Sequence, residues 1–222
     1  MSPAAAKSPS PQPGRFVTLE GGEGTGKTTQ ARMLVRRLEA TGRKVEPTRE
    51  PGGTPLGRRL EELLKGGSGR IVPGRRSELL LYLADRAQHV EKVIAPALQR
   101  GWVVVCDRFI DSSEVYQGRA RGLGVEMVRR FNRWACGEIW PDITILLDLD
   151  PEQGLKRARE RQDSLGLGLD RLEREDLAFH QAVRQGFLDQ ARKDPERIKV
   201  VDAARPPEEV AEHIWSLVRE IL

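Results

Sequence analysis

The sequence predicts an α/β fold in three layers, in which a parallel sheet of about five strands has helices on both faces. Two observations predict it. Short β-prone runs alternate along the chain with longer segments whose apolar residues recur at helical spacing. The runs at 103–105 and 143–147 are almost continuously apolar, as expected for central strands that helices cover on both sides.

The elements follow one another in regular order. The first predicted strand, residues 16–20, leads through a glycine-rich segment into a helix in which Met33, Leu34 and Leu38 share one face. Strands are predicted at 16–20, 44–48, 102–106, 143–148 and 198–201. Helices are predicted at 29–40, 55–65, 77–99 with Pro96 as a candidate kink, 125–135, 151–162, 172–192 and 207–222. Residues 66–74 are predicted as a loop, and 163–170 as a mobile segment between helices.

Length and composition indicate one domain. A chain of 222 residues can bury a substantial core, and residues 16–222 are assigned to it. Residues 1–15 are rich in Pro, Ala and Ser, lack the apolar centre of a signal peptide, and are predicted to be a disordered tail. No later stretch has the roughly 18 uninterrupted apolar residues of a membrane span, so no membrane partner is expected.

Charge and cysteine content exclude other classes of protein. Basic residues exceed acidic ones by four, but the two kinds are interleaved along 152–161 and 171–176, which favours a solvated surface over nucleic-acid binding. Cys106 and Cys136 lie far apart, with no zinc-binding spacing. A reducing compartment fits this usage, and a cytoplasmic location is expected.

The glycine-rich segment has the G-x-x-x-x-G-K-[ST] pattern of a phosphate-binding loop, completed by Gly21, Gly26, Lys27 and Thr28. Backbone N–H groups of such a loop form a nest for anions, the lysine adds positive charge at the β- and γ-phosphates, and the threonine hydroxyl ligates Mg²⁺. The preceding strand and following helix argue against a chance match, so we expect a nucleoside triphosphate here. The predicted binding residues are Gly21, Gly22, Glu23, Gly24, Thr25, Gly26, Lys27, Thr28 and Thr29.

Polar residues also follow two other predicted strands. The run 48–53 follows one of them, and Asp107 with Arg108 follows the other. In a parallel sheet these ends lie at one edge. A carboxylate there can hold Mg²⁺ and a guanidinium can clamp phosphate, although a simple Asp–Arg ion pair is the structural alternative.

Taken together, these segments closely resemble bacterial thymidylate kinases. The resemblance rests on the phosphate loop, R-E-P-G-G-T at 49–54, D-R-F at 107–109 with Ser112, Y-Q-G at 116–118, P-D at 141–142 and D-R-L-E at 170–173. It extends over nearly the whole chain after the tail. It implies the three-layer P-loop kinase fold with a mobile lid at about 157–171, and ATP-dependent phosphorylation of dTMP to dTDP in dTTP biosynthesis.

The resemblance also implies roles for individual residues. Lys27 would stabilise the transferring phosphoryl group, Thr28 would ligate Mg²⁺, and Asp107 would organise both the metal and Arg108. Arg49 and Arg108 would hold the dTMP phosphate, and two guanidiniums around one dianion would position it as well as neutralise it. Glu23 would accept a hydrogen bond from the deoxyribose 3′-hydroxyl.

The thymine base would be recognised by side chains from two segments. Tyr82 and Arg86 lie one helical turn apart, so both can face one pocket, with Tyr82 stacking on the base and Arg86 donating to its O4. The family usually has Phe in place of Tyr82, and core packing among neighbouring leucines is the structural alternative. Ser112, with Ser113, would contact the pyrimidine edge, Tyr116 would pack on the sugar, and Gln117 is a neighbouring polar group.

The catalytic arginine is expected from the lid, because the phosphate loop contains none. Arg161 aligns best with the family's lid arginine, although the segment after it is longer than usual. The other candidates are Arg157, Arg159 and Arg171. The resemblance further suggests a homodimer formed by helix packing.

Three rival functions remain at this point. A kinase for another nucleoside monophosphate would use the same phosphate chemistry. A GTPase switch or a non-catalytic P-loop module is a rival of another class, and the absence of an N-K-x-D motif counts against the switch. A nucleic-acid-binding ATPase would depend on the basic excess and the tail.

Overall fold

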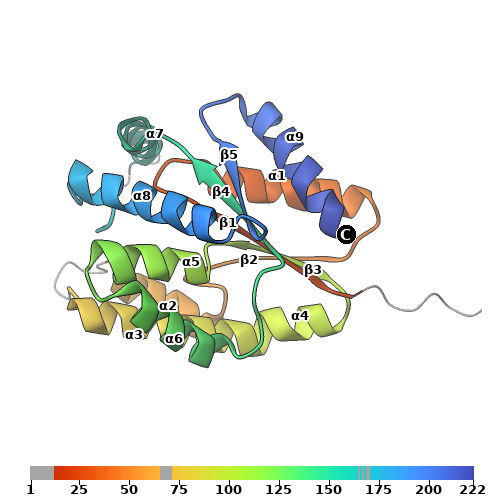
Figure 1. Ribbon diagram of the computed structural model, residues 1–222, viewed down its shortest axis with the longest axis horizontal. Helices are drawn as coiled ribbons and strands as arrows, with labels where there is room; N and C mark the ends of the chain where they lie inside the picture. The colour runs from red at the N-terminus through yellow and green to blue at the C-terminus, as the bar shows by residue number, and fades with distance from the viewer. Residues whose placement is uncertain (1–12, 66–71, 165, 167, 169–170) are drawn as a thin grey trace, which may run out of the picture.

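The structure, a computed structural model, describes residues 13–65, 72–164, 166, 168 and 171–222 (Figure 1). The predicted tail up to residue 12, the predicted loop over 66–71, and residues 165, 167, 169 and 170 of the predicted mobile segment lie outside the described residues. No described helix is long and apolar enough to cross a membrane.

Within the described residues, five parallel strands form one sheet in the order β2-β3-β1-β4-β5. The strands are β1 Arg15–Glu20, β2 Val45–Arg49, β3 Val103–Asp107, β4 Ile143–Asp148 and β5 Ile198–Asp202. The predicted strands and the predicted α/β fold are therefore confirmed.

The helices are α1 Lys27–Ala40, α2 Pro55–Leu64, α3 Arg75–His89, α4 Ala95–Gln99, α5 Ile110–Ser113, α6 Val125–Cys136, α7 Pro151–Ser164, α8 Leu177–Lys193 and α9 Pro207–Val218. Two π-helices, Val90–Ile94 and Glu114–Ala120, and a 3₁₀-helix, Arg219–Ile221, complete the described secondary structure.

Helices cover both faces of the sheet (Figure 1). On one face, Leu34 and Leu38 of α1 and Ile214 of α9 pack against the strands. On the other face, the residues that pack on the sheet include Ile94 of the π-helix Val90–Ile94 and Phe187 of α8. The central strands are buried on both sides, which explains their continuous apolar sequence.

The single helix predicted at 77–99 is instead three consecutive segments: α3, the π-helix Val90–Ile94 and α4. Pro96 is the physical reason. A proline lacks an N–H, and in an α-helix its ring clashes with the carbonyl four residues earlier. The wider π turns directly before it relieve that clash.

Two other predictions of helices differ from the structure. The helix predicted from 172 begins only at Leu177, because Asp176 caps it and accepts a hydrogen bond from the backbone N of Phe179 at 2.8 Å. The helical stretch formed by α5 and the π-helix Glu114–Ala120 was not predicted. Its buried side chains include Glu114 and Gln117, so it lacks the apolar periodicity that marks an amphipathic helix.

Candidate active site

The polar ends of three strands meet at one edge of the sheet. β3 lies between β1 and β2, and Asp107 of β3 is in register with Leu19 on one side and Arg49 on the other. The phosphate loop leaves β1 one residue after Leu19. Thus the strand order alone places the loop, Asp107 and Arg49 beside one another, as predicted from the sequence.

These strand ends border a cavity of about 740 Å³, called here the main cavity. Most of the predicted site residues line it: Glu23, Gly24, Gly26, Lys27, Thr28, Thr29, Arg49, Tyr82, Arg86, Asp107, Arg108, Ser112, Tyr116, Gln117 and Arg161. A cavity of this size accommodates a ligand larger than a single phosphate group.

Lys27 is held at the wall of the main cavity by its own loop. Its Nζ donates to the carbonyls of Gly21 at 3.1 Å and Gly22 at 2.6 Å, and to Oγ1 of Thr25 at 3.4 Å. Burial, and then the charge of Arg108, lower the pKa of Lys27 to about 8. An anionic phosphate bound here would favour the charged ammonium and raise this pKa again.

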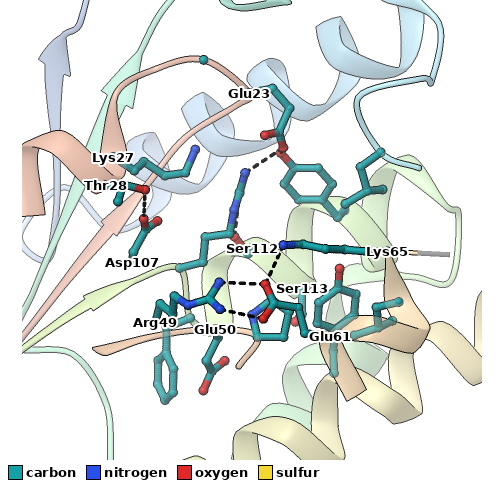
Figure 2. Close-up of a pocket in the computed structure, with 18 of the residues that line it drawn as sticks. Glu23, Lys27, Thr28, Arg49, Glu50, Glu61, Lys65, Asp107, Ser112 and Ser113 are labelled. Atoms are coloured by element: carbon teal, nitrogen blue, oxygen red, sulfur yellow. Dashed lines mark hydrogen bonds and ion pairs between the residues drawn. The ribbon is translucent and has the colours of Figure 1, made fainter. Parts of the chain in front are cut away.

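The two predicted metal ligands are in direct contact. The hydroxyl of Thr28, at the start of α1, donates to Oδ2 of Asp107 at 2.6 Å (Figure 2). Each brings a hard oxygen to the same point, next to the N-terminus of α1. This donor set suits Mg²⁺, which takes one or two protein oxygens and completes its coordination with phosphate and water.

Glu23 accepts hydrogen bonds from two side chains of the main cavity. It accepts from Nη2 of Arg108 at 2.7 Å and from the Tyr116 hydroxyl at 2.9 Å. Burial raises its pKa, but the charges of Arg108 and Lys27 and the Tyr116 hydrogen bond outweigh burial and lower the pKa of Glu23 to about 2. Glu23 is therefore an anion at neutral pH and can accept a hydrogen bond from a ligand hydroxyl.

Arg108 carries backbone strain at this point. Its φ is 70°, in the left-handed region that costs a non-glycine residue about 1–2 kcal/mol. Its guanidinium lies over the ring of Tyr116, 5.2 Å from the centroid, and also donates to the carbonyl of Gly21 at 3.1 Å. Such strain persists where surrounding contacts hold it, and it is common at functional sites.

The tip of the phosphate loop packs directly on the backbone of α7. A Cβ on Gly24, whose φ is +67°, would lie 1.9 Å from the carbonyl oxygen of Gly154, and a Cβ on Gly154 would lie 2.3 Å from the carbonyl oxygen of Glu23. Both distances are far below any contact between such atoms. Glycine at both positions is thus what lets α7, the helix that leads into the predicted lid, touch the loop.

A buried carboxylate lies beneath the loop. Glu20, at the end of β1, accepts from the backbone N of Phe109 at 2.7 Å and from the Ser112 hydroxyl at 2.6 Å. Burial, and then the charge of Asp111, raise the pKa of Glu20 to about 7. The sequence pattern indicates no separate role for Glu20, because its burial and its partners depend on the position of α5.

Arg86 is buried within the scaffold. Its five N–H groups donate to Glu50, to Ser113 at 2.8 Å, to Asn132 at 2.7 Å and to the carbonyl of Phe109 at 3.0 Å, with Glu50 accepting from both Nε and Nη2. Its predicted hydrogen bond to a thymine O4 would therefore replace one of these. That role remains a prediction.

Three other predicted residues line the same wall. Gln117 is buried and donates to Glu78 at 2.7 Å, while Ser112 donates to Glu20. Tyr82 is half-buried and lines the main cavity, and core packing does not account for that exposed part. Its predicted stacking on the base stays a prediction.

The predicted lid arginines separate into two groups. Among the described residues of the lid, Arg161 and Arg171 line the main cavity. Arg161 donates to Glu173 at 2.8 Å, and Arg171 pairs with Glu78. Arg157 instead donates to the carbonyl of Ala203 at 3.0 Å, and Arg159 is exposed beside a separate shallow hollow.

Four charged residues that line the main cavity had no predicted site role: Arg32, Glu50, Glu61 and Lys65. Glu61 binds both terminal nitrogens of Arg49, at 2.7 and 2.6 Å, and Lys65 at 2.7 Å (Figure 2). The only signal in the sequence is the i, i+4 spacing of Glu61 and Lys65 on a predicted helix. Contact with Arg49 could not be foreseen, because it depends on how α2 packs beside β2.

Comparison with known proteins identifies the family of the chain. The sequence profile of the family described as "Thymidylate kinase" matches residues 19–214. The chain belongs to the thymidylate kinase family. Among its relatives, the thymidylate kinase of Deinococcus radiodurans is 50% identical over 207 residues, which cover 93% of this chain and 97% of that protein. The thymidylate kinase of Synechococcus sp. (strain JA-2-3B'a(2-13)) is 53% identical over 203 residues, covering 91% and 93% respectively.

A solved structure supports the same assignment at the level of the fold. The crystal structure of thymidylate kinase from Ehrlichia chaffeensis superposes with a TM-score of 0.73 at 32% identity, covering 93% of this chain and 99% of that one. The thymidylate kinase fold therefore extends over the described strands and helices, and the resemblance stated from the motifs is confirmed.

Proposed function

We propose that this chain phosphorylates dTMP to dTDP with ATP as the phosphoryl donor. Membership of the thymidylate kinase family supports the reaction, and so do relatives of that name at about half identity over nearly their full length. The observation that carries the proposal is the main cavity itself. It has the phosphate loop on one side and a second group of cations, Arg49 and Arg108, within the same space.

The positions of the side chains support the following roles in phosphate binding. Lys27 and the N-terminus of α1 bind the phosphates of ATP, and Lys27 stabilises the charge that develops on the transferring group. Arg49 and Arg108 hold the phosphate of dTMP. Asp107, on the strand between Arg49 and the loop, orients the acceptor side of the reaction. Catalysis then consists mainly of positioning and charge stabilisation.

Mg²⁺ fits the pair formed by Thr28 and Asp107. Their oxygens are one hydrogen bond apart, whereas no group of three or more His, Cys, Asp or Glu able to hold a metal occurs among the described residues. A site with two protein oxygens suits an ion that arrives bound to ATP phosphates. When bound, Mg²⁺ would neutralise charge on those phosphates.

The nucleoside of dTMP lies in the part of the main cavity that Tyr82, Tyr116 and the Glu23 side chain of the loop line. Glu23, an anion held by Arg108 and Tyr116, accepts a hydrogen bond from the 3′-hydroxyl. The ring of Tyr116 packs on the sugar and that of Tyr82 on the base, while Ser112 and Gln117 lie at the edge of the same space. Arg86 reads the base only if one of its present acceptors is replaced.

Arg161 supplies the mobile cation of the lid. It lines the main cavity and its side chain is 54% exposed, held by one ion pair to Glu173. On closure it moves from that partner towards the transferring phosphoryl group and helps to exclude water. Arg171, the other candidate in the cavity wall, is 17% exposed and paired with Glu78, which favours a structural role.

The assembly proposed is a homodimer. Met127, Phe131 and Trp134 lie at helical spacing on one face of α6 and are exposed, Trp134 by 82%. Leu80 of the adjacent α3 is exposed by 60%. An apolar surface of this kind suits a second copy of the chain, and Trp134→Glu should then shift the protein from dimer to monomer in sedimentation.

The proposed compartment is the cytoplasm. Cys106 and Cys136 are both buried free thiols, and burial raises the pKa of Cys136 to about 12, so neither is set up for oxidation. Free thiols of this kind are usual in reducing compartments.

A coupled ADP-release assay against a panel of nucleoside monophosphates tests reaction and acceptor together. We expect saturable turnover with dTMP, weaker turnover with the other monophosphates, and a loss of orders of magnitude in Lys27→Ala without loss of the fold. ATP binding with no response to dTMP would refute the proposed reaction. Preference for another monophosphate would leave a kinase of different specificity.

A further inference from the structure

Glu61 is an acidic side chain next to Arg49, to which the proposed function gives the binding of a phosphate. It extends from the last turn of α2 into the main cavity, and its side chain is 9% exposed. Both of its oxygens are used: the terminal nitrogens of Arg49 donate to them at 2.7 and 2.6 Å, and Nζ of Lys65 lies 2.7 Å away (Figure 2). The two cations compensate the buried charge of Glu61, because a buried carboxylate without a partner would destabilise the fold.

The backbone makes room for this arrangement. Gly52 has a φ of +105°, and a Cβ there would lie 2.5 Å from Oε2 of Glu61 and 3.0 Å from Nη2 of Arg49. The Arg49–Glu61 pair therefore fills space that a side chain at residue 52 would need. The turn after β2 and the position of α2 are both matched to the ion pair.

The pair leaves part of Arg49 unused. A guanidinium has five N–H groups, and Glu61 takes one from each terminal nitrogen. Within the described part of the chain, Nε and the two other N–H groups have no acceptor, and the Arg49 side chain is 50% exposed in the cavity wall. One edge of the guanidinium is thus fixed by protein while the other edge is free for a ligand.

We propose that Glu61 is a positioning residue for the acceptor phosphate: it holds the Arg49 guanidinium so that its free edge faces the phosphate of the nucleoside monophosphate. This inference depends on the proposed function, in which Arg49 binds that phosphate. An arginine held in its binding geometry loses less rotamer freedom when the anion arrives, so binding is stronger. A fork–fork carboxylate pair is the arrangement that fixes a guanidinium in both position and plane.

Lys65 adds a positive charge that offsets the repulsion between the Glu61 carboxylate and the phosphate of the nucleoside monophosphate. Arg49 and Lys65 both pair with Glu61, so one positive charge remains over the three side chains. The hydrogen bond that Arg49 donates to Glu61 raises the pKa of Arg49. Burial raises the pKa of Glu61, but the hydrogen bonds and charges of Arg49 and Lys65 outweigh burial and hold this pKa below its ordinary value. The charges of Arg49 and Glu61 are thus retained at neutral pH, and the formal charge of the three side chains is positive towards a dianion.

Steady-state kinetics of Glu61→Gln test the inference, with Glu62→Gln as the matched control. Glu62 is next to it on α2, but its side chain is 62% exposed and pairs with Arg59. In Glu61→Gln we expect KM for dTMP to rise by about tenfold, the order expected when one long side chain must be ordered again on binding. KM for ATP should not change, and Glu62→Gln should match the unmodified protein throughout.

Two further measurements separate positioning from a structural role. Thymidine, which lacks the phosphate, should inhibit Glu61→Gln with the same Ki as the unmodified protein. Arg49→Ala should also raise KM for dTMP, and adding Glu61→Gln to it should have little further effect, because Glu61 acts through Arg49.

Each other outcome overturns the inference. A fall in KM for dTMP in Glu61→Gln would show that Glu61 competes with the phosphate. An unchanged KM in Glu61→Gln beside a raised KM in Arg49→Ala would mean that Arg49 needs no positioning. A changed Ki for thymidine would mark a general structural effect. Unchanged KM in both variants would remove Arg49 from the phosphate site while leaving the kinase reaction intact.

Discussion

Replacing Gly154 by alanine sets two effects of opposite sign against each other. Gly154 is in the interior of α7, where alanine is preferred over glycine by about 1 kcal/mol. However, the added Cβ would lie 2.3 Å from the carbonyl oxygen of Glu23. Overpacking of this kind costs about 1–3 kcal/mol, and the atom that must give way is backbone. The two effects leave the fold unchanged in stability or destabilised by about 2 kcal/mol.

The larger consequence falls on ATP binding. The carbonyl of Glu23 belongs to the phosphate loop, so relief of the clash displaces the N–H groups that would bind the ATP phosphates. If about 1–2 kcal/mol of strain appears as lost binding, ATP affinity should fall about 5- to 30-fold. Titration calorimetry with ATP measures this directly, and a thermal melt measures the stability of the same variant.

Gln153→Ala is the matched control, because its side chain is exposed on the same turn of α7. It should leave ATP affinity unchanged. The reasoning would be refuted if Gly154→Ala melted at a higher temperature than the unmodified protein and bound ATP equally well. That result would mean that alanine stabilises α7 and that the new Cβ does not clash with the carbonyl of Glu23.

Three other changes give equally direct tests. The pKa of Glu20 is raised from 4.5 to about 7, so its contribution to the free energy of unfolding is complete below pH 4.5 and is lost as pH rises through 7. The free energy of unfolding should therefore fall by at most about 3 kcal/mol between pH 5 and pH 8, as measured by urea unfolding. In Glu20→Gln this fall should be absent. A pH profile with the same slope in both proteins would contradict this. Tyr116→Phe removes a hydrogen bond to the charged Glu23 and should lower kcat/KM for dTMP about tenfold, whereas unchanged kinetics would exclude that hydroxyl from substrate binding. Arg161→Ala should lower kcat more than it raises KM, and Arg157→Ala, whose guanidinium contacts Ala203, should leave kcat alone; equal losses in both would move the catalytic role away from Arg161.

The regular part of the fold could be predicted because its signal is local. The apolar runs of β3 and β4 and the turn residues around them fix the strands, and the parallel order then brings Asp107 beside the phosphate loop. The π-helix Glu114–Ala120 could not be predicted in this way. Its polar side chains are buried against partners from distant segments, as Glu114 is against Arg129 at 2.8 Å.

The site residues also differ in whether a local sequence signal could predict them. Residues in contiguous motifs, such as Lys27, Thr28 and Arg108, were placed in the main cavity by the sequence pattern and are found there. Glu61 was missed, because nothing near it in sequence indicates that it reaches Arg49. Arg86 was singled out for a ligand, yet its donors meet protein acceptors, a distinction that depends on the placement of four separate segments.

The buried Arg86 guanidinium connects the main cavity to a helix on the outer surface of the molecule. Arg86 joins the turn after β2, the start of the helical stretch at 110–120, and, through Asn132, the helix whose far side presents Phe131 and Trp134 to solvent. Hydrogen bonds of 2.7 to 3.0 Å through Arg86 therefore connect α6 to residues that line the main cavity. A partner bound at Phe131 and Trp134, as in the proposed homodimer, would therefore be linked through Arg86 to the proposed substrate site.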